Sequence, residues 1–319
     1  MNDGGSREVE KARVHLRSGA VVLILAILLT VSLPLQAQEE DPRLETLLRR
    51  LSRTAELFRD TTLQFACTEQ FRWRGAGDPG EATFEYVFVY DDENGFEDYR
   101  TTPFHAKRRK APAEISPSDR GVPWFLRSAY LWIFVFRESR QGLHHYRIVG
   151  EEEVLGVDAV LIEFEPIPPI QPEVNDWYGV AWVDPALGQL LKVVALEPDD
   201  HQIRRTFEDT WRSNIVDEAR AEYSTVTTVF TQERSGLRFP GKVTLENARY
   251  RWRKKPEKAK EVYKREGGRN LLKERPPGVS RKKVLMRVEQ TYRDYRFFSV
   301  RTVDEVENYI LRRRTDPGP

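Results

Sequence analysis

Histidine and cysteine, two residue types that often carry chemistry, are scarce in this chain, with five and one, and the small groups that contain histidine have simpler structural explanations. His144 and His145 could bind a metal ion, but neighbouring residues of a strand face opposite ways and cannot readily chelate one ion. The run from Asp199 to His201 could belong to a hydrolytic site, yet it follows Pro198 in a predicted loop and has no matching ligand spacing elsewhere. No glycine-rich phosphate loop, nucleophile elbow or metalloprotease helix motif occurs. The sequence therefore predicts no catalytic residue, no metal site and no cofactor.

Aromatic residues at strand spacing form a stronger pattern. In a strand, alternate residues share one face, so a row from Phe84 to Tyr90 lies beside the aromatic residues of the run 63–73. A packed core is the default interpretation of such rows, and an apolar half-barrel cavity for an acyl chain or an apolar protein segment is the alternative. The candidates for lining this cavity are Phe71, Trp73, Phe84, Tyr86, Phe88, Tyr90, Trp124, Tyr130 and Trp132.

Two periodicities indicate the elements that position these residues. Residues 42–59 carry an apolar stripe at helical spacing, preceded by Asp41 as a predicted N-cap. Trp124–Phe136 is the most apolar stretch after the N-terminal segment, and a short helix over 124–134 is favoured over a buried strand. Strands are expected over 63–73, 84–90, 96–101, 146–153, 157–165, 177–183, 189–197, 221–233, 237–252 and 282–300.

The N-terminus has the pattern of a secretory signal peptide. Three basic residues (Lys11, Arg13 and Arg17) precede the apolar run 20–33, and a small residue, Ala37, ends the segment. The apolar run has about 15 residues, whereas a membrane span needs roughly 20, so cleavage after Ala37 is favoured over an uncleaved anchor. We therefore expect a signal peptide over 1–37 and an exported protein of the periplasm or cell envelope, with one β-rich domain over 38–319.

Composition limits the partners. The chain has 51 basic and 50 acidic residues and a net charge of +1, which gives no general argument for nucleic acid, and export removes that partner. Cys67 is the single cysteine, so no internal disulfide can form and the core must hold the fold.

Charge is unevenly divided along the chain. Residues 151–200 contain twelve acidic residues and one basic residue, whereas 249–287 contain sixteen basic and four acidic ones. The polar segment 253–279 is expected to be a basic flexible loop, which is either a solvated spacer or a site for an anionic envelope surface. The basic residues proposed to contact that partner are Lys254, Lys255, Lys258, Lys260, Lys264 and Arg265.

The segment 146–196 carries a resemblance to a known family. It reads as a strand, a turn at Leu155-Gly156 and a second strand, followed by a hairpin at Asp184-Pro185-Ala186-Leu187-Gly188. Together with the helix, the long antiparallel strands and the inserted apolar segment, this order resembles the periplasmic lipoprotein-carrier superfamily of the LolA/LolB type. The resemblance implies an unclosed β-barrel with a helical lid over an apolar cavity, which shuttles or senses hydrophobic or lipidated ligands.

We therefore expect an α+β protein, a large antiparallel unclosed β-barrel (half-barrel) with an N-terminal helix and a short inserted helix. The favoured function is non-catalytic binding of a hydrophobic ligand, a lipid or a lipidated protein, in the cell envelope. The alternative is a structural or regulatory module that docks another envelope protein without a small ligand. An enzyme with an unrecognised site is the third and weakest hypothesis.

Overall fold

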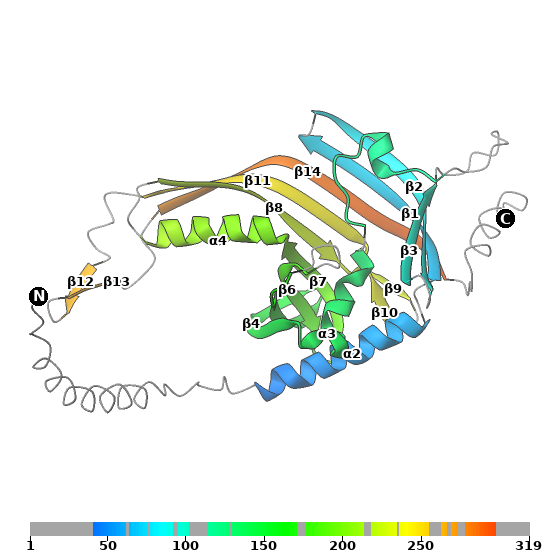
Figure 1. The fold of residues 1–319 in the computed structure, drawn as a ribbon, viewed down its shortest axis with the longest axis horizontal. Helices are drawn as coiled ribbons and strands as arrows, with labels where there is room; N and C mark the ends of the chain where they lie inside the picture. The colour runs from blue at the N-terminus through cyan, green and yellow to red at the C-terminus, as the bar shows by residue number, and fades with distance from the viewer. Residues whose placement is uncertain are drawn as a thin grey trace, which may run out of the picture. The chain divides into compact units, whose positions relative to one another are not determined.

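The computed structural model describes twelve stretches of the chain, and its fold is shown in Figure 1. These stretches are residues 41–61, 64–75, 77–91, 95–101, 114–127, 129–170, 176–213, 218–234, 236–254, 263–266, 269–272 and 278–297. The predicted signal peptide over 1–37 therefore lies outside the described residues.

The described residues form three α-helices, two 3-10 helices and fourteen strands. The helices are α2 (Pro42–Thr61), η1 (Pro117–Arg120), η2 (Ala129–Phe136), α3 (Glu138–Gln141) and α4 (Pro198–Arg212). The first strands are β1 (Gln64–Gly75), β2 (Gly77–Asp91), β3 (Gly95–Thr101), β4 (His144–Val154), β5 (Val157–Pro166), β6 (Tyr178–Asp184) and β7 (Gln189–Leu196). The remaining strands are β8 (Glu218–Val229), β9 (Gln232–Arg234), β10 (Leu237–Phe239), β11 (Lys242–Lys254), β12 (Tyr263–Glu266), β13 (Arg269–Leu272) and β14 (Gly278–Phe297).

Ten of these strands form one antiparallel sheet, which is curved in Figure 1. The strand order is β3-β2-β1-β14-β11-β8-β7-β6-β5-β4, so the meander from β4 to β8 continues through β11 and β14 onto β1. Strands β3 and β4 stand at the two ends of this order, so the sheet built by the described strands is open. The predicted α+β fold with a large unclosed antiparallel sheet is confirmed.

The sheet has two faces because side chains alternate along each strand. We call inner the face whose side chains contact η2, such as Thr228 of β8 and Phe65 of β1. Both faces carry buried side chains, because α4 covers part of the outer face, where its Phe207 packs against Ala219 and Trp252. The inner face carries the larger core.

The amphipathic stripe of α2 explains which side of this helix is buried. Leu47, Leu51, Ala55 and Phe58 recur every three or four residues and are buried. The predicted cap is also present, because the Asp41 side chain accepts a hydrogen bond from the amide of residue 43 at 2.9 Å. In isolation such a helix would be only marginally stable in water, so the helical structure of α2 depends on the burial of this stripe.

The turns expected in the segment 146–196 are formed. Leu155 and Gly156 both have positive φ, 56° and 75°, which is the conformation that a tight hairpin turn between β4 and β5 requires. In the next hairpin the Asp184 side chain accepts hydrogen bonds from the amides of Ala186 and Leu187, and Gly188 follows with φ 63°.

Three expectations from the sequence need correction. The inserted segment is a 3-10 helix, Ala129–Phe136, which begins five residues after the predicted start. The run from Asp199 to His201 does not lie in a loop, because it forms the first turn of α4. The predicted loop over 253–279 contains a hairpin of β12 and β13, and β11 and β14 extend into its two ends.

Candidate functional site

The inner face of β1, β2 and β14 carries a cluster of aromatic rings around Tyr130 of η2. The Tyr130 ring centroid lies 4.6 Å from that of Phe65, 5.8 Å from that of Tyr86 and 5.4 Å from that of Tyr292. These separations are in the range of favourable aromatic contact. Alternation along β1 and β2 places the rings on one face, and the apolar η2 brings Tyr130 to them.

Most of the predicted cavity residues lie on this inner face. Six of them are buried, namely Phe71, Phe84, Tyr86, Phe88, Tyr130 and Trp132, whereas Trp73 and Trp124 are half-buried. The side chain of Tyr90 lies outside the described part of the structure. Trp132 belongs to a second group on the other half of the sheet, where its ring packs against Trp177 at 5.5 Å and its indole N–H donates to the Thr228 hydroxyl at 3.0 Å. That these residues line a ligand cavity stays a prediction.

A buried polar cluster lies at the edge of these rings, and the sequence did not reveal it. Glu69, Arg100 and Gln290 expose 0%, 5% and 1% of their surface, although all three are polar. The Arg100 guanidinium donates two hydrogen bonds to the Glu69 carboxylate, at 2.7 Å and 3.2 Å, and it also pairs with Asp98. It lies 4.5 Å from the centre of the Tyr86 ring, a cation–π distance.

Burial shifts the pKa values of the side chains in and around this cluster. Burial lowers the pKa of Arg100, but the charge and hydrogen bonds of Glu69, together with Tyr86 and Asp98, raise the pKa above its ordinary value. Burial raises the pKa values of the neighbouring phenols of Tyr86, Tyr130 and Tyr292, so these side chains stay neutral. The ion pair of Glu69 and Arg100 therefore lies among neutral aromatic side chains.

Gln290 connects this polar cluster to the segment that leads into η2. Its side-chain amide donates to the Glu69 carboxylate at 2.6 Å, and it exchanges two hydrogen bonds of 3.2 Å with the backbone of Leu126. A glutamine amide matches a backbone amide in this way because each has one donor and one acceptor. The cluster therefore fixes where the chain enters the inner face before η2 begins.

The residues first considered for metal or hydrolytic chemistry do not come together. His144 is buried and His145 is exposed, as their neighbouring positions on β4 predict. Burial lowers the pKa of His144, whose ring lies 3.7 Å from Asp176. His201 stacks on Tyr178 with ring centroids 3.8 Å apart. Among the described residues, no group of three or more metal-ligating side chains is arranged to hold an ion.

The structure does not describe the side chains of the basic residues proposed to contact an anionic partner. Lys254 ends β11, and Lys264 and Arg265 belong to β12, but the description of these three positions covers the backbone alone. Lys255, Lys258 and Lys260 lie outside the described residues. The anionic partner of this segment stays a prediction.

Comparisons with known proteins give likenesses in fold. No family model matches the chain, and no curated protein is significantly similar to it. Among solved structures, the chain is similar to an outer membrane lipoprotein-sorting protein domain from Vibrio parahaemolyticus, with 11% identity, a TM-score of 0.41, and 83% of this chain and 98% of that chain covered. No helix in the described stretches is long and apolar enough to cross a membrane.

Two further solved structures are similar at the same level. One is a LolA superfamily protein from Nitrosomonas europaea, with 12% identity, a TM-score of 0.36, and 82% and 98% of the two chains covered. The other is the MucA/MucB complex of Pseudomonas aeruginosa, with 16% identity, a TM-score of 0.23, and 80% and 99% covered. One of these structures is of the superfamily that the sequence resembles. At these identities and TM-scores the likenesses carry no argument about function, and the open sheet is established by its own strand order.

Proposed function

We propose that this protein is exported and binds a hydrophobic or lipidated ligand on the inner face of its open sheet, without catalysis. The observation that carries the proposal is η2, an eight-residue segment that buries seven of its residues against the inner face. A 3-10 helix of this length is uncommon, because its hydrogen bonds have poor geometry. Its position therefore depends on apolar contacts, which an apolar ligand can also make.

Polar contacts also hold η2 in place. The Trp132 indole N–H donates to the Thr228 hydroxyl, the Tyr146 hydroxyl donates to the carbonyl of Val135 at 2.6 Å, and the Tyr295 hydroxyl donates to that of Tyr130 at 3.1 Å. Gln141 binds the end of the segment. Gln141 also connects this end to α2, because its amide donates to the carbonyls of both Phe136 and Leu48, at 2.9 Å and 3.1 Å. In the proposed function η2 is a lid, and the ligand replaces its contacts with the aromatic rings.

The lid can be tested by loosening its attachment. Gln141→Ala removes both hydrogen bonds to α2 and to the end of η2, each of which contributes about 1 kcal/mol. We expect this variant to bind an apolar fluorescent probe, 1-N-phenylnaphthylamine, about 5–30 times more tightly than the unaltered protein. The reason is that the state with η2 packed on the aromatic rings is less stable in the variant, so less free energy is needed to displace η2. Gln202→Ala on the exposed side of α4 is the matched control and should change nothing. Equal probe affinity in all three proteins would contradict a movable lid.

The identity of the ligand needs a second experiment. Native mass spectrometry of protein purified from its own host envelope should show an added lipid mass. Tyr86→Glu separates a ligand space from a filled core, because an unpaired carboxylate in a packed interior costs several kcal/mol. A folded variant that no longer takes up the probe would support the ligand site, whereas an unfolded variant would make the aromatic rings ordinary core.

One observation favours a second candidate function. The rings of Phe65, Tyr86 and Tyr130 are already in contact, so the inner face near them is occupied by the chain itself. A protein with a filled inner face would act as an interaction module that docks another envelope protein through its exterior. Purification from the host with a stoichiometric protein partner and no lipid would support this alternative.

A further inference from the structure

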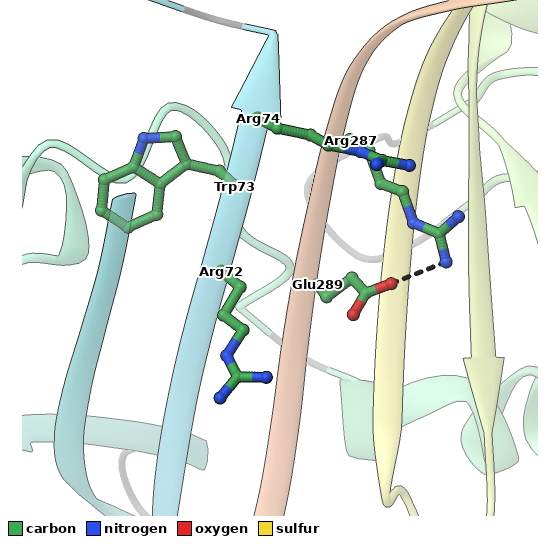
Figure 2. A pocket seen from close by; sticks show the side chains of 5 residues that line it. All are labelled: Arg72, Trp73, Arg74, Arg287 and Glu289. Atoms are coloured by element: carbon green, nitrogen blue, oxygen red, sulfur yellow. Dashed lines mark ion pairs between the residues drawn. The ribbon is translucent and has the colours of Figure 1, made fainter. Parts of the chain in front are cut away.

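A second site of a different chemical kind lies on the outer face, between the end of β1 and the middle of β14. Figure 2 shows the pocket, of about 310 Å³, with Arg72, Trp73 and Arg74 from β1 and Arg287 and Glu289 from β14. Alternation along β1 puts Arg72 and Arg74 on the outer face and directs the Trp73 ring away from them, as Figure 2 also shows. Three guanidinium groups and one carboxylate therefore line a single shallow pocket.

The pairing of β1 with β14 brings two like charges together in this pocket. Arg74 lies directly opposite Arg287 in the register, and Arg72 lies opposite Glu289. Like charges at directly opposite positions destabilise a sheet, so this pair costs free energy unless an anion lies between or beside the two groups.

The backbone beside the pocket is specialised to bring these groups close. The register of β14 shifts between Met286 and Val284, so Leu285 is an extra residue that forms a bulge next to Arg287. Gly75 ends β1 with φ 89°, and a Cβ there would overlap the carbonyl oxygen of Leu285. This close approach of the two strands requires glycine, and it holds Arg74 against β14.

The anionic groups of the neighbourhood neutralise only some of these arginines. Arg287 pairs with Glu289 at 2.6 Å and with Glu246 at 3.3 Å, and its buried Nε has no hydrogen-bond partner in the described structure. Arg72 lies 3.7 Å from Glu81 in an exposed and therefore weak pair. Figure 2 shows one ion pair among the five lining side chains, from Arg287 to Glu289, and Arg74 takes no part in it.

We propose that this arginine pocket, defined by Arg72, Arg74 and Arg287, binds a phosphoryl group. Guanidinium groups recognise phosphate through two parallel hydrogen bonds, and a group with more than one charged oxygen can bridge Arg74 and Arg287. The ligand removes the repulsion between the two opposed arginines, which a monodentate anion would do less completely. This site lies on the face opposite to the aromatic rings, so it does not depend on the proposed hydrophobic ligand.

Thermal unfolding with inorganic phosphate tests the site. At a phosphate concentration about 100 times the dissociation constant, the midpoint of the intact protein should rise by about 5–10 °C over a sodium chloride control of equal ionic strength. Arg74→Gln should lower phosphate affinity about tenfold or more, since one charge-assisted contact is lost. Without phosphate, the same variant should unfold at the same or a higher temperature, because the repulsion with Arg287 is gone.

The matched control is Arg293→Gln, which removes an exposed arginine from the same face of β14, paired with Asp294 at 3.7 Å. It should keep the full phosphate response. Equal responses of the intact protein and Arg74→Gln, or no response of either above the chloride control, would overturn the proposal.

A vesicle-binding experiment distinguishes a lipid headgroup from a free phosphate compound. If the phosphoryl group belongs to a lipid, the protein should cosediment with phosphatidylglycerol vesicles and less with phosphatidylcholine ones, and Arg74→Gln should lose this difference. If the compound is free, phosphate should still stabilise the protein through Arg74, while vesicle binding is absent or unchanged by the substitution. Either pattern assigns the site, because both depend on Arg74 and not on Arg293.

Discussion

The buried pair of Glu69 and Arg100 gives the sharpest test of how the inner face is held together. Arg100→Met keeps much of the side-chain volume and removes the guanidinium. The Glu69 carboxylate, with 0% of its side chain exposed, then keeps a hydrogen bond from Gln290 but loses its opposite charge. Breaking a buried ion pair in this way costs about 3–5 kcal/mol, because an uncompensated charge stays in the interior.

The partner substitution should cost less. Glu69→Gln leaves Arg100 with Asp98, whose side chain is partly exposed, and with the face of the Tyr86 ring. We therefore expect a loss of about 1.5–3 kcal/mol, the range for a hydrogen bond to a charged group. The double variant should cost much less than the sum of the two, with a coupling energy of about 2–3 kcal/mol.

The assay is urea unfolding followed by tryptophan fluorescence. The Arg100→Met variant should show a lower midpoint with an unchanged dependence on denaturant, and its thermal midpoint should fall by about 6–20 °C. The control is the exposed pair of Arg249 and Glu222, at 3.0 Å, whose coupling should be about 0–1 kcal/mol. Additive single effects at Glu69 and Arg100, within about 0.5 kcal/mol, would refute the reasoning, because the pair would then contribute no more than an exposed one.

Four further predictions follow from particular residues. Gly75→Ala should destabilise the fold by about 2 kcal/mol or more in urea unfolding, and more than Gly77→Ala, because φ is positive at both positions but a Cβ meets backbone only at Gly75. Burial raises the pKa of the Cys67 thiol, so iodoacetamide should modify it at pH 8 only after unfolding; rapid modification of the native protein would contradict this burial. Burial lowers the pKa of His144 below its ordinary 6.5, so as the pH falls the unfolded chain binds a proton at His144 before the folded protein does. The free energy of unfolding should therefore fall as the pH drops below about 6.5, and His144→Gln should make this decline shallower. N-terminal sequencing of protein from its host should begin at or near Gln38, and an intact Met1 on cytosolic protein would exclude the signal peptide.

The sequence was most informative where one element could be recognised without its neighbours. The stripe of α2 and the alternation of β1 are local patterns, and these two elements formed within two residues of their predicted bounds. Strand β2 begins at Gly77, seven residues before the predicted start at Phe84, because the chain already reverses between Gly75 and Gly77. The helix α4 was missed because its apolar residues, Ile203, Phe207 and Trp211, recur only every fourth position in a polar background. Pro198 at its first turn, with Asp199 and Asp200 behind it, was the start signal that could have revealed it.

The polar cluster and the arginine pocket could not be predicted from local pattern. Glu69 was visible as a charged residue on an otherwise apolar strand face, which indicates that a buried partner exists but does not identify it. Its partners are 31 and 221 residues away. Arg100 reaches it from β3 through the pairing of β3 with β2 and of β2 with β1, and Gln290 reaches it through the pairing of β1 with β14. The arginine pocket depends on the same pairing and on the bulge at Leu285, neither of which leaves a periodic signal.

Strand β14 shows how one stretch of sequence can serve two kinds of surface. Its alternate residues Val288, Gln290 and Tyr292 are buried on the inner face, while Arg287 and Glu289 face the outer pocket. Because the side-chain period is two, a shift of one residue in the register would exchange these sets and place charges among the aromatic rings. The pairing of Gln290 with both Glu69 and Leu126 opposes such a shift, since it satisfies the buried polar groups in one register. The buried network on the inner face therefore also fixes the geometry of the arginine pocket on the outer face.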